Sequence, residues 1–146
     1  MKDQEFKSVD ILLIEDNPGD IFLTKKAFKS CKLSNRLFVA EDGEKAISFL
    51  KKEGEYKDAV TPDIILLDLN LPGKDGREIL AEIKEDEDLK SIPVIILTSS
   101  DAEKDILTTY KLHANSYIVK PVDFTKFLEI VSSIENFWFT IVKLPK

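Results

Sequence analysis

Residues 63–68 read DIILLD, four large aliphatic residues enclosed by two aspartates. A run of this kind has no polar face to turn toward water, so it predicts a short strand that is buried on both sides. Further apolar runs at residues 9–14, 36–40, 92–97 and 116–119 predict four more strands. The strand at residues 63–68 is the clearest of the five and is expected at the centre of the sheet.

Amphipathic segments with apolar residues at helical spacing alternate with these strands. Helices are expected at residues 18–29, around Ala46 to Leu50, around Ile79 to Ile83, at residues 103–112 and from Phe124 onward. This alternation predicts an α/β fold, a doubly wound five-stranded parallel sheet with helices on both faces. In such sheets ligands bind at the carboxyl ends of the strands, near the point where strand order reverses.

The bulk composition is that of one globular domain. The 146 residues are 43% hydrophobic and 33% charged, and no second domain is visible, so output is expected through protein contacts or dimerisation. A net charge of −6 without a basic stripe argues against direct nucleic-acid binding. The polar N-terminus and the lack of a long apolar run predict a cytoplasmic protein without a membrane span. Cys31, the only cysteine, excludes an internal disulfide and is expected to be an ordinary helix residue.

Polar side chains gather where four of the predicted strands end. They are Glu15 and Asp16 after the first strand, Asp68 and Asn70 at the third, Thr98 after the fourth and Lys120 after the fifth. Because the carboxyl ends of parallel strands meet at one edge of a sheet, we expect these residues to form a single site.

Carboxylates crowded at one edge repel one another unless a cation offsets their charge. A hard divalent cation, Mg²⁺ or Mn²⁺, does so with oxygen ligands. We expect Asp16 and Asp68 to ligate it directly and Glu15 to act through a bound water. The backbone carbonyl of Asn70 is a further candidate ligand.

Asp68 is the expected nucleophile, because it ends the central strand and a carboxylate can attack phosphorus to form an acyl phosphate. Lys120 would supply a positive charge to a phosphoryl oxygen, and the Thr98 hydroxyl a hydrogen bond. Each residue has a plainer alternative, since Asp68 and Thr98 could be simple caps and the acidic pair a helix N-cap. The convergence of four strand ends on one edge favours a single functional site over a set of unrelated caps. His113 is not needed for this chemistry and is expected at the surface.

These motifs together resemble the response-regulator receiver domain of two-component signalling, a flavodoxin-like fold. The matching pieces are ILLIEDN, DIILLDLNLPGKDG, PVIILTSS and YIVKP. The resemblance covers about residues 8–136 of a single domain, 1–146, with 137–146 as a helical extension. It implies that Asp68 is phosphorylated, that Glu15 and Asp16 form the acidic pocket, and that Lys120 contacts the phosphate.

The resemblance also implies a partner and an output. The partner would be a sensor histidine kinase, and the chain would be no enzyme beyond catalysing its own phosphorylation and dephosphorylation. Thr98 would move toward the phosphoryl group and Tyr117 would rotate inward, although Tyr117 can also be a strand aromatic without a switching role. Receivers often hold the bond between Lys120 and Pro121 cis, and we expect that here. Whether the phosphoryl group passes onward in a relay stays open.

A narrower likeness, to single-domain regulators paired with cyanobacterial phytochromes, rests on GEY at residues 54–56, the run LNLPGKDGREILAEIKEDEDLKSIPV and the ending IENFWFTIVKLPK. It implies a kinase of the phytochrome type.

The last predicted helix is apolar around much of its circumference. Its apolar residues are Phe124, Phe127, Leu128, Ile130, Val131, Ile134, Phe137, Trp138 and Ile141. So wide an apolar surface predicts a second apolar neighbour. That neighbour is either another subunit, in a homodimer through the face of the fourth helix, fifth strand and fifth helix, or the chain's own domain, onto which the tail folds back.

Two rival functions remain at this point. A small phosphohydrolase with an aspartyl nucleophile resembles a pattern of two aspartates spaced by one on the first strand, whereas here the acidic pair is adjacent and Asp68 is on the third strand. A receiver-shaped interaction module that needs no phosphorylation is disfavoured, because every active-site residue is present.

Overall fold

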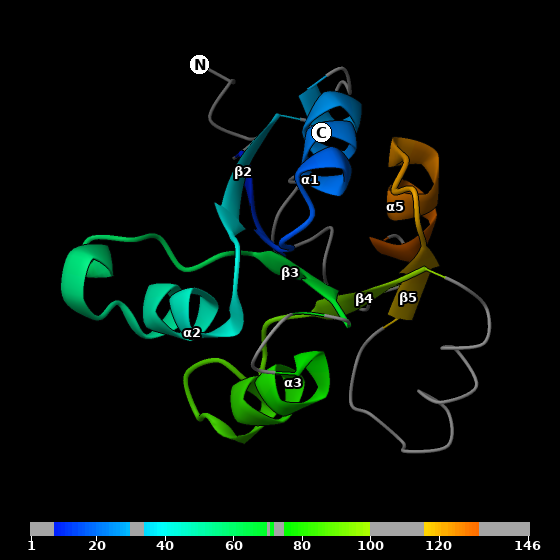
Figure 1. Ribbon diagram of the computed structural model, residues 1–146. Helices are drawn as coiled ribbons and strands as arrows, with labels where there is room; N and C mark the ends of the chain where they lie inside the picture. The colour runs from blue at the N-terminus through cyan, green and yellow to red at the C-terminus, as the bar shows by residue number, and fades with distance from the viewer. Residues whose placement is uncertain (1–7, 30–33, 70, 72–74, 100–115, 132–146) are drawn as a thin grey trace, which may run out of the picture.

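The structure is a computed structural model that describes residues 8–29, 34–69, 71, 75–99 and 116–131. The elements in chain order are β1 (Val9–Ile14), α1 (Pro18–Lys29), β2 (Asn35–Ala40), α2 (Gly43–Lys51), the 3₁₀ turn η2 (Gly54–Tyr56), β3 (Ile64–Asp68), α3 (Gly76–Glu85), β4 (Val94–Thr98), β5 (Ser116–Val119) and α5 (Phe124–Val131) (Figure 1). The helix expected at 103–112, His113, Cys31, Asn70 and the tail from residue 132 lie outside the described residues.

The strands form one parallel sheet in the order β2-β1-β3-β4-β5. From β1 the chain moves outward to β2, and from β3 it moves in the opposite direction to β4 and β5. Strand order therefore reverses between β1 and β3. Helices α1 and α5 cover one face of the sheet, while α2 and α3 cover the other (Figure 1). The predicted doubly wound fold is confirmed.

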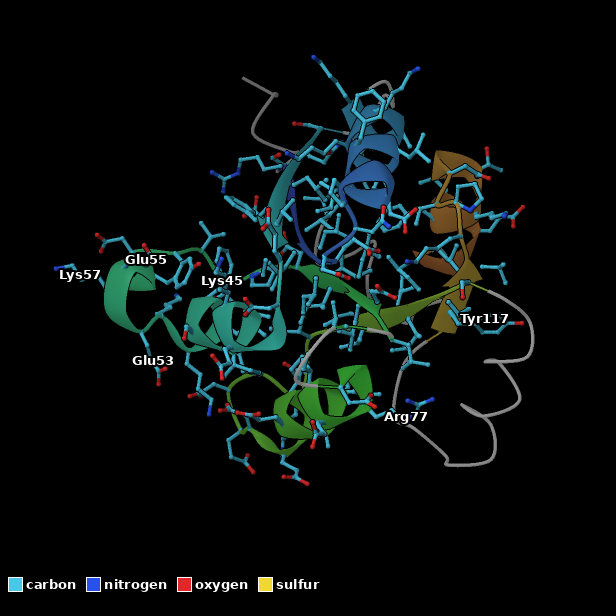
Figure 2. The ribbon with its side chains drawn as sticks, viewed as in Figure 1. Lys45, Glu53, Glu55, Lys57, Arg77 and Tyr117 are labelled. Atoms are coloured by element: carbon cyan, nitrogen blue, oxygen red, sulfur yellow. The ribbon has the colours of Figure 1, made fainter. Side chains whose placement is uncertain are left out.

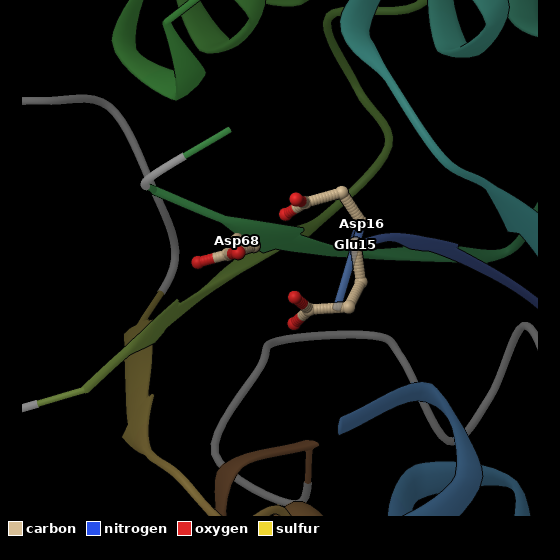
Figure 3. A group of neighbouring side chains, drawn as sticks. All are labelled: Glu15, Asp16 and Asp68. Atoms are coloured by element: carbon tan, nitrogen blue, oxygen red, sulfur yellow. The ribbon is translucent and has the colours of Figure 1, made fainter. Parts of the chain in front are cut away.

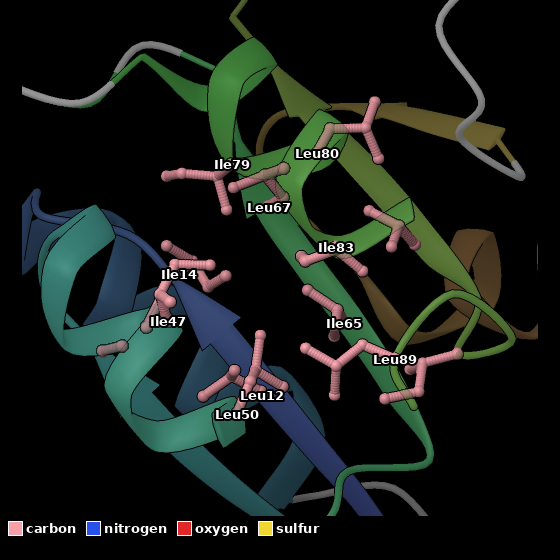
Figure 4. Close-up of a cluster of buried hydrophobic side chains, with 14 of the residues drawn as sticks. Leu12, Ile14, Ile47, Leu50, Ile65, Leu67, Ile79, Leu80, Ile83 and Leu89 are labelled. Atoms are coloured by element: carbon pink, nitrogen blue, oxygen red, sulfur yellow. The ribbon is translucent and has the colours of Figure 1, made fainter. Parts of the chain in front are cut away.

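Each central strand supplies side chains to two separate cores. On β1, Leu12 and Ile14 pack with residues of α2 and α3 (Figure 4). The intervening Ile11 and Leu13 pack on the opposite face with Phe28 of α1 and Phe127 of α5, whose rings lie edge to face at 4.8 Å. Because helices cover both faces of the sheet, apolar residues do not alternate with polar ones along these strands. The strands were predicted from these continuous apolar runs.

The fourth strand differs from the expectation in its bounds. The fourth strand runs from Val94 to Thr98 rather than over residues 92–97, so Thr98 is the last residue of β4 and not the residue after it. Its carbonyl accepts a hydrogen bond from the Lys120 N–H at 2.8 Å, which keeps it in the ladder. On α1, Phe22 is 63% exposed, whereas Thr24 and Phe28 face the sheet. No helix among the described residues is both long and apolar enough to cross a bilayer.

Candidate functional site

The register of the sheet brings the predicted side chains to one edge. Ile14 of β1 lies beside Leu67 of β3, so Glu15 and Asp68 follow on adjacent strands at the point where strand order reverses. On the other side of β3, Asp68 pairs with Leu97. β5 continues the edge with Val119 beside Thr98, and Lys120 follows directly. This is the position at which doubly wound sheets bind ligands.

Three carboxylates meet at the centre of this edge. Oxygens of Glu15, Asp16 and Asp68 lie within 4.8 Å of one another, and Figure 3 shows both β1-end carboxylates turned toward Asp68. Glu15 and Asp68 are buried, with side chains 1% and 5% exposed, whereas Asp16 is open to solvent. A cation would therefore meet two buried oxygen donors and one exposed one.

Lys120 is the cation that the structure places against this cluster. Its Nζ lies 3.0 Å from Oε1 of Glu15 and 3.4 Å from Oδ1 of Asp68. Its shortest contact, 2.9 Å, is to Oδ2 of Asp20 in the first turn of α1. Sequence reasoning missed Asp20. The available signal, an aspartate in the first turn of a helix, indicates an ordinary N-terminal charge and says nothing of a lysine 100 residues away.

The pocket perturbs the protonation of two of these groups. Burial raises the pKa of Glu15 to about 7, the nearby Asp68 carboxylate adds to that rise, and Lys120 offsets part of it. Burial by itself would lower the pKa of Lys120, but contacts with Asp20 and Glu15 and the charge of Asp68 raise it above its ordinary value. Lys120 is therefore a permanent cation, and it does not fully compensate the carboxylates.

The donor set fits a hard divalent cation. Oε1 of Glu15 is buried and, although it lies at ion-pair distance from Lys120, it receives no well-aligned hydrogen bond. A carboxylate oxygen left in this state next to two further carboxylates is suited to ligate Mg²⁺ or Mn²⁺, both of which prefer oxygen donors. Glu15, Asp16 and Asp68 are the residues that would hold it.

Two further predicted residues, Thr98 and Tyr117, lie on β4 and β5. Thr98 is fully buried at the end of β4. Tyr117 lies on β5 beside Ile96 and is partly buried against the core formed with α2 and α3 (Figure 2). The bond between Lys120 and Pro121 is cis, which confirms that prediction.

Gly76 brings α3 against the end of β3. A Cβ at this position would lie 2.8 Å from the backbone oxygens of both Asp68 and Leu69, so only glycine permits the close approach. The Gly76 N–H donates to the Leu69 carbonyl at 3.2 Å. Asp75 and Glu78 cap the start of α3 reciprocally. The backbone that carries Asp68 is thereby held from the α3 side.

Comparisons with known proteins agree with this geometry. The family model of the response regulator receiver domain matches residues 11–132. Response regulator Rcp1 of Synechocystis is 43% identical over 145 residues, 99% of each chain. Its Mn²⁺-bound crystal structure has a TM-score of 0.72 at 44% identity and covers 94% of this chain and 99% of that one.

Two further solved structures are similar. The phosphorylated cyanobacterial phytochrome response regulator RcpA is 46% identical, with a TM-score of 0.74 over 96% of this chain and 100% of that one. The bacteriophytochrome response regulator AtBRR is 41% identical, with a TM-score of 0.81 over 86% of this chain and 91% of that one. The chain belongs to the response-regulator receiver family, whose members are phosphorylated on an aspartate in two-component signalling.

Proposed function

We propose that this chain is a phosphorylation switch in which Asp68 accepts a phosphoryl group from a sensor histidine kinase, with Mg²⁺ or Mn²⁺ held by Glu15, Asp16 and Asp68. The observation that carries the proposal is the setting of Asp68. Its carboxylate is buried at the end of the central strand, within 3.4 Å of an ammonium and next to two more carboxylates. A carboxylate with a purely structural role would not need two further carboxylates beside it.

The chemistry asked of the site is positioning and charge stabilisation. An oxygen of Asp68 forms a bond to phosphorus while the bond from phosphorus to the kinase histidine nitrogen breaks, and that nitrogen keeps the electron pair. The bound cation would offset negative charge on the transferring oxygens. Lys120 supplies a second positive charge at the same place, and the Thr98 hydroxyl is the proposed donor to a phosphoryl oxygen. Asn70 would add its carbonyl to the metal ligands.

The proposed output is a change of the face that contains β5 and α5. Phosphorylation adds about −1.5 to −2 charges and three acceptor oxygens, which would draw Thr98 inward and let Tyr117 follow. Support comes from the placement of Thr98 beside Val119 in the sheet, two residues from Tyr117. The changed face would then control a protein partner or dimerisation.

The proposed kinase is of the phytochrome type. The chain itself is proposed to be cytoplasmic and to act as one receiver unit over residues 1–146. Support comes from RcpA and AtBRR, which are regulators of a cyanobacterial phytochrome and a bacteriophytochrome respectively.

The test uses acetyl phosphate as the phosphodonor and intact-mass measurement as the readout. With Mg²⁺ the chain should gain the mass of one phosphoryl group, and the gain should vanish with EDTA or in Asp68→Asn. Uptake by Asp68→Asn at the wild-type rate would overturn the proposal. Multiple turnover of phosphate esters without a stable phosphoprotein would instead favour the phosphohydrolase.

A further inference from the structure

The closest partner of Lys120 lies outside the acidic pocket. Asp20 contacts Nζ at 2.9 Å from α1, while Glu15 and Asp68 contact it at 3.0 and 3.4 Å from the strand ends. The Asp20 side chain is 31% exposed, against 1% for Glu15. Lys120 is thus held from two sides, by the buried pocket and by a carboxylate at its rim.

Asp20 is held firmly in place by its own helix. Its N–H donates to Oδ1 of Asn17 at 2.9 Å, the N-cap arrangement, and its carbonyl accepts from the Thr24 hydroxyl at 2.8 Å. The backbone of Asp20 is therefore fixed immediately after the acidic pair at the end of β1. From this position its carboxylate reaches across to the turn between β5 and α5, where Lys120 lies.

A lysine ammonium has three N–H donors, and three carboxylates surround this one. A phosphoryl group on Asp68 would bring three new acceptor oxygens and more negative charge than any of these carboxylates. Turning a second donor toward the phosphoryl group, besides the one that already faces Asp68, would loosen the contact of Lys120 with Glu15 or Asp20. Asp20 is the partner to be released, because it is the most exposed of the three and water can solvate it afterwards.

We propose that Asp20 is a positioning residue that competes with the incoming phosphoryl group for Lys120 and so restrains phosphorylation. This inference rests on the proposed function, since it concerns how the same site is regulated. Asp20 does not touch the phosphoryl group and acts through Lys120. In the resting protein Asp20 holds one side of the ammonium, and in the phosphorylated protein it is displaced.

The first test compares initial rates of phosphorylation by acetyl phosphate, with excess Mg²⁺, at low ionic strength. In this reaction an Asp68 oxygen bonds to phosphorus while acetate leaves with the bridging oxygen and its electron pair. Asp20→Asn keeps the shape and removes the charge, so uptake should rise on the order of three- to tenfold. Asp20→Glu keeps the charge and should retain the wild-type rate.

The matched control is Asp58→Asn, which makes the same charge change at an exposed position between η2 and β3, before the opposite end of that strand. Its rate should equal that of wild type. No uptake by wild type would refute the proposed function itself. Uptake by wild type with no gain in Asp20→Asn, or an equal gain in Asp58→Asn, would refute only the role of Asp20.

A second measurement separates competition from a structural role. The side-chain NMR signal of Lys120 should differ between wild type and Asp20→Asn in the resting state. It should coincide in the two proteins once each is saturated with beryllofluoride, a stable phosphoryl mimic, because Asp20 has then been released. An equal difference in both states would show that Asp20 stays bound to Lys120 and would overturn the displacement.

Discussion

The two ends of the central strands both carry acidic residues and a cation, yet they are built differently. At the amino end, Asp10 receives two hydrogen bonds from Arg36, at 2.7 and 2.9 Å, and its N–H donates to Asp63 at 2.8 Å. The guanidinium engages both oxygens of Asp10, and Asp63 accepts from the Asp10 N–H, so each carboxylate has a hydrogen-bond donor. At the carboxyl end, Glu15, Asp20 and Asp68 share one ammonium.

This difference separates a structural contact from a chemical site. A fork-shaped arginine saturates both oxygens of Asp10 and leaves nothing for a ligand. Among the described residues, the point charge of Lys120 leaves the carboxyl end with excess negative charge and with a buried Glu15 oxygen lacking a well-aligned hydrogen bond. The carboxyl end is therefore the one that can take up a cation and a phosphoryl group. Substitutions at the carboxyl end should therefore change phosphoryl uptake and metal binding, whereas substitutions at the amino end should change only the stability of the fold.

The largest expected effect is loss of phosphorylation at the carboxyl end only. Asp68→Asn should lower phosphoryl uptake from acetyl phosphate by roughly a hundredfold or more, because the amide cannot act as the nucleophile. Arg36→Met at the amino end should leave the uptake rate unchanged. Intact-mass kinetics on both variants check this. A similar loss in both would mean that the two ends are not independent.

The second largest effect is expected for the stabilisation of the fold by Mg²⁺, which should depend on the carboxyl end alone. Saturating the chain with Mg²⁺ at about 100 times its dissociation constant should stabilise the fold by about 3 kcal/mol, since the cation binds only the native cluster. Thermal unfolding with and without Mg²⁺ measures this. Asp68→Asn should lose most of the gain, and Asp10→Asn should retain it. Equal gains in all three proteins would place the metal elsewhere.

The pH dependence of stability follows from Glu15. Its pKa is about 7 in the folded, metal-free protein and 4.5 in a model peptide, so between these values the folded state binds more protons than the unfolded state. The stability that this group contributes is then largest below about pH 4.5 and is lost as the pH rises through 7, on the order of 3 kcal/mol in all. Chemical denaturation in EDTA at several pH values should show the decline in wild type and a flatter profile in Glu15→Gln. The same slope in both would remove Glu15 as its source.

The smallest effect is expected at the amino end. Asp10→Asn weakens the paired hydrogen bonds from Arg36 and should lower the melting temperature by roughly 2 to 4 °C, in the metal-free protein as in the metal-bound one. In contrast, Glu15→Gln should raise the melting temperature of the metal-free protein at pH 8, because it removes a buried charge. Calorimetry of both variants tests the contrast in sign. A stabilising Asp10→Asn would contradict it.

Much of the fold was predictable, because strands covered on both faces must be apolar throughout. Residues 9–14 and 116–119 match β1 and β5 at both ends. Boundaries were less certain where local signals compete: the apolar run at 92–97 includes Pro93, which has no N–H for a ladder, and β4 begins after it. The apolar residues of α1 did not reveal which side faces the sheet, and Phe22 proved exposed.

The sequence by itself determined the five strands and the polar residues that follow them, because burial on two faces and the step into solvent are local properties of a chain. Only the tertiary structure decided how much charge the site retains. Whether Lys120 faces two carboxylates or three depends on where α1 begins relative to the turn after β5, and the pairing with Asp20 arises from packing between segments 100 residues apart. The contact between Lys120 and Asp20 could not be predicted from their spacing in the sequence, because it depends on how α1 and the turn after β5 pack together.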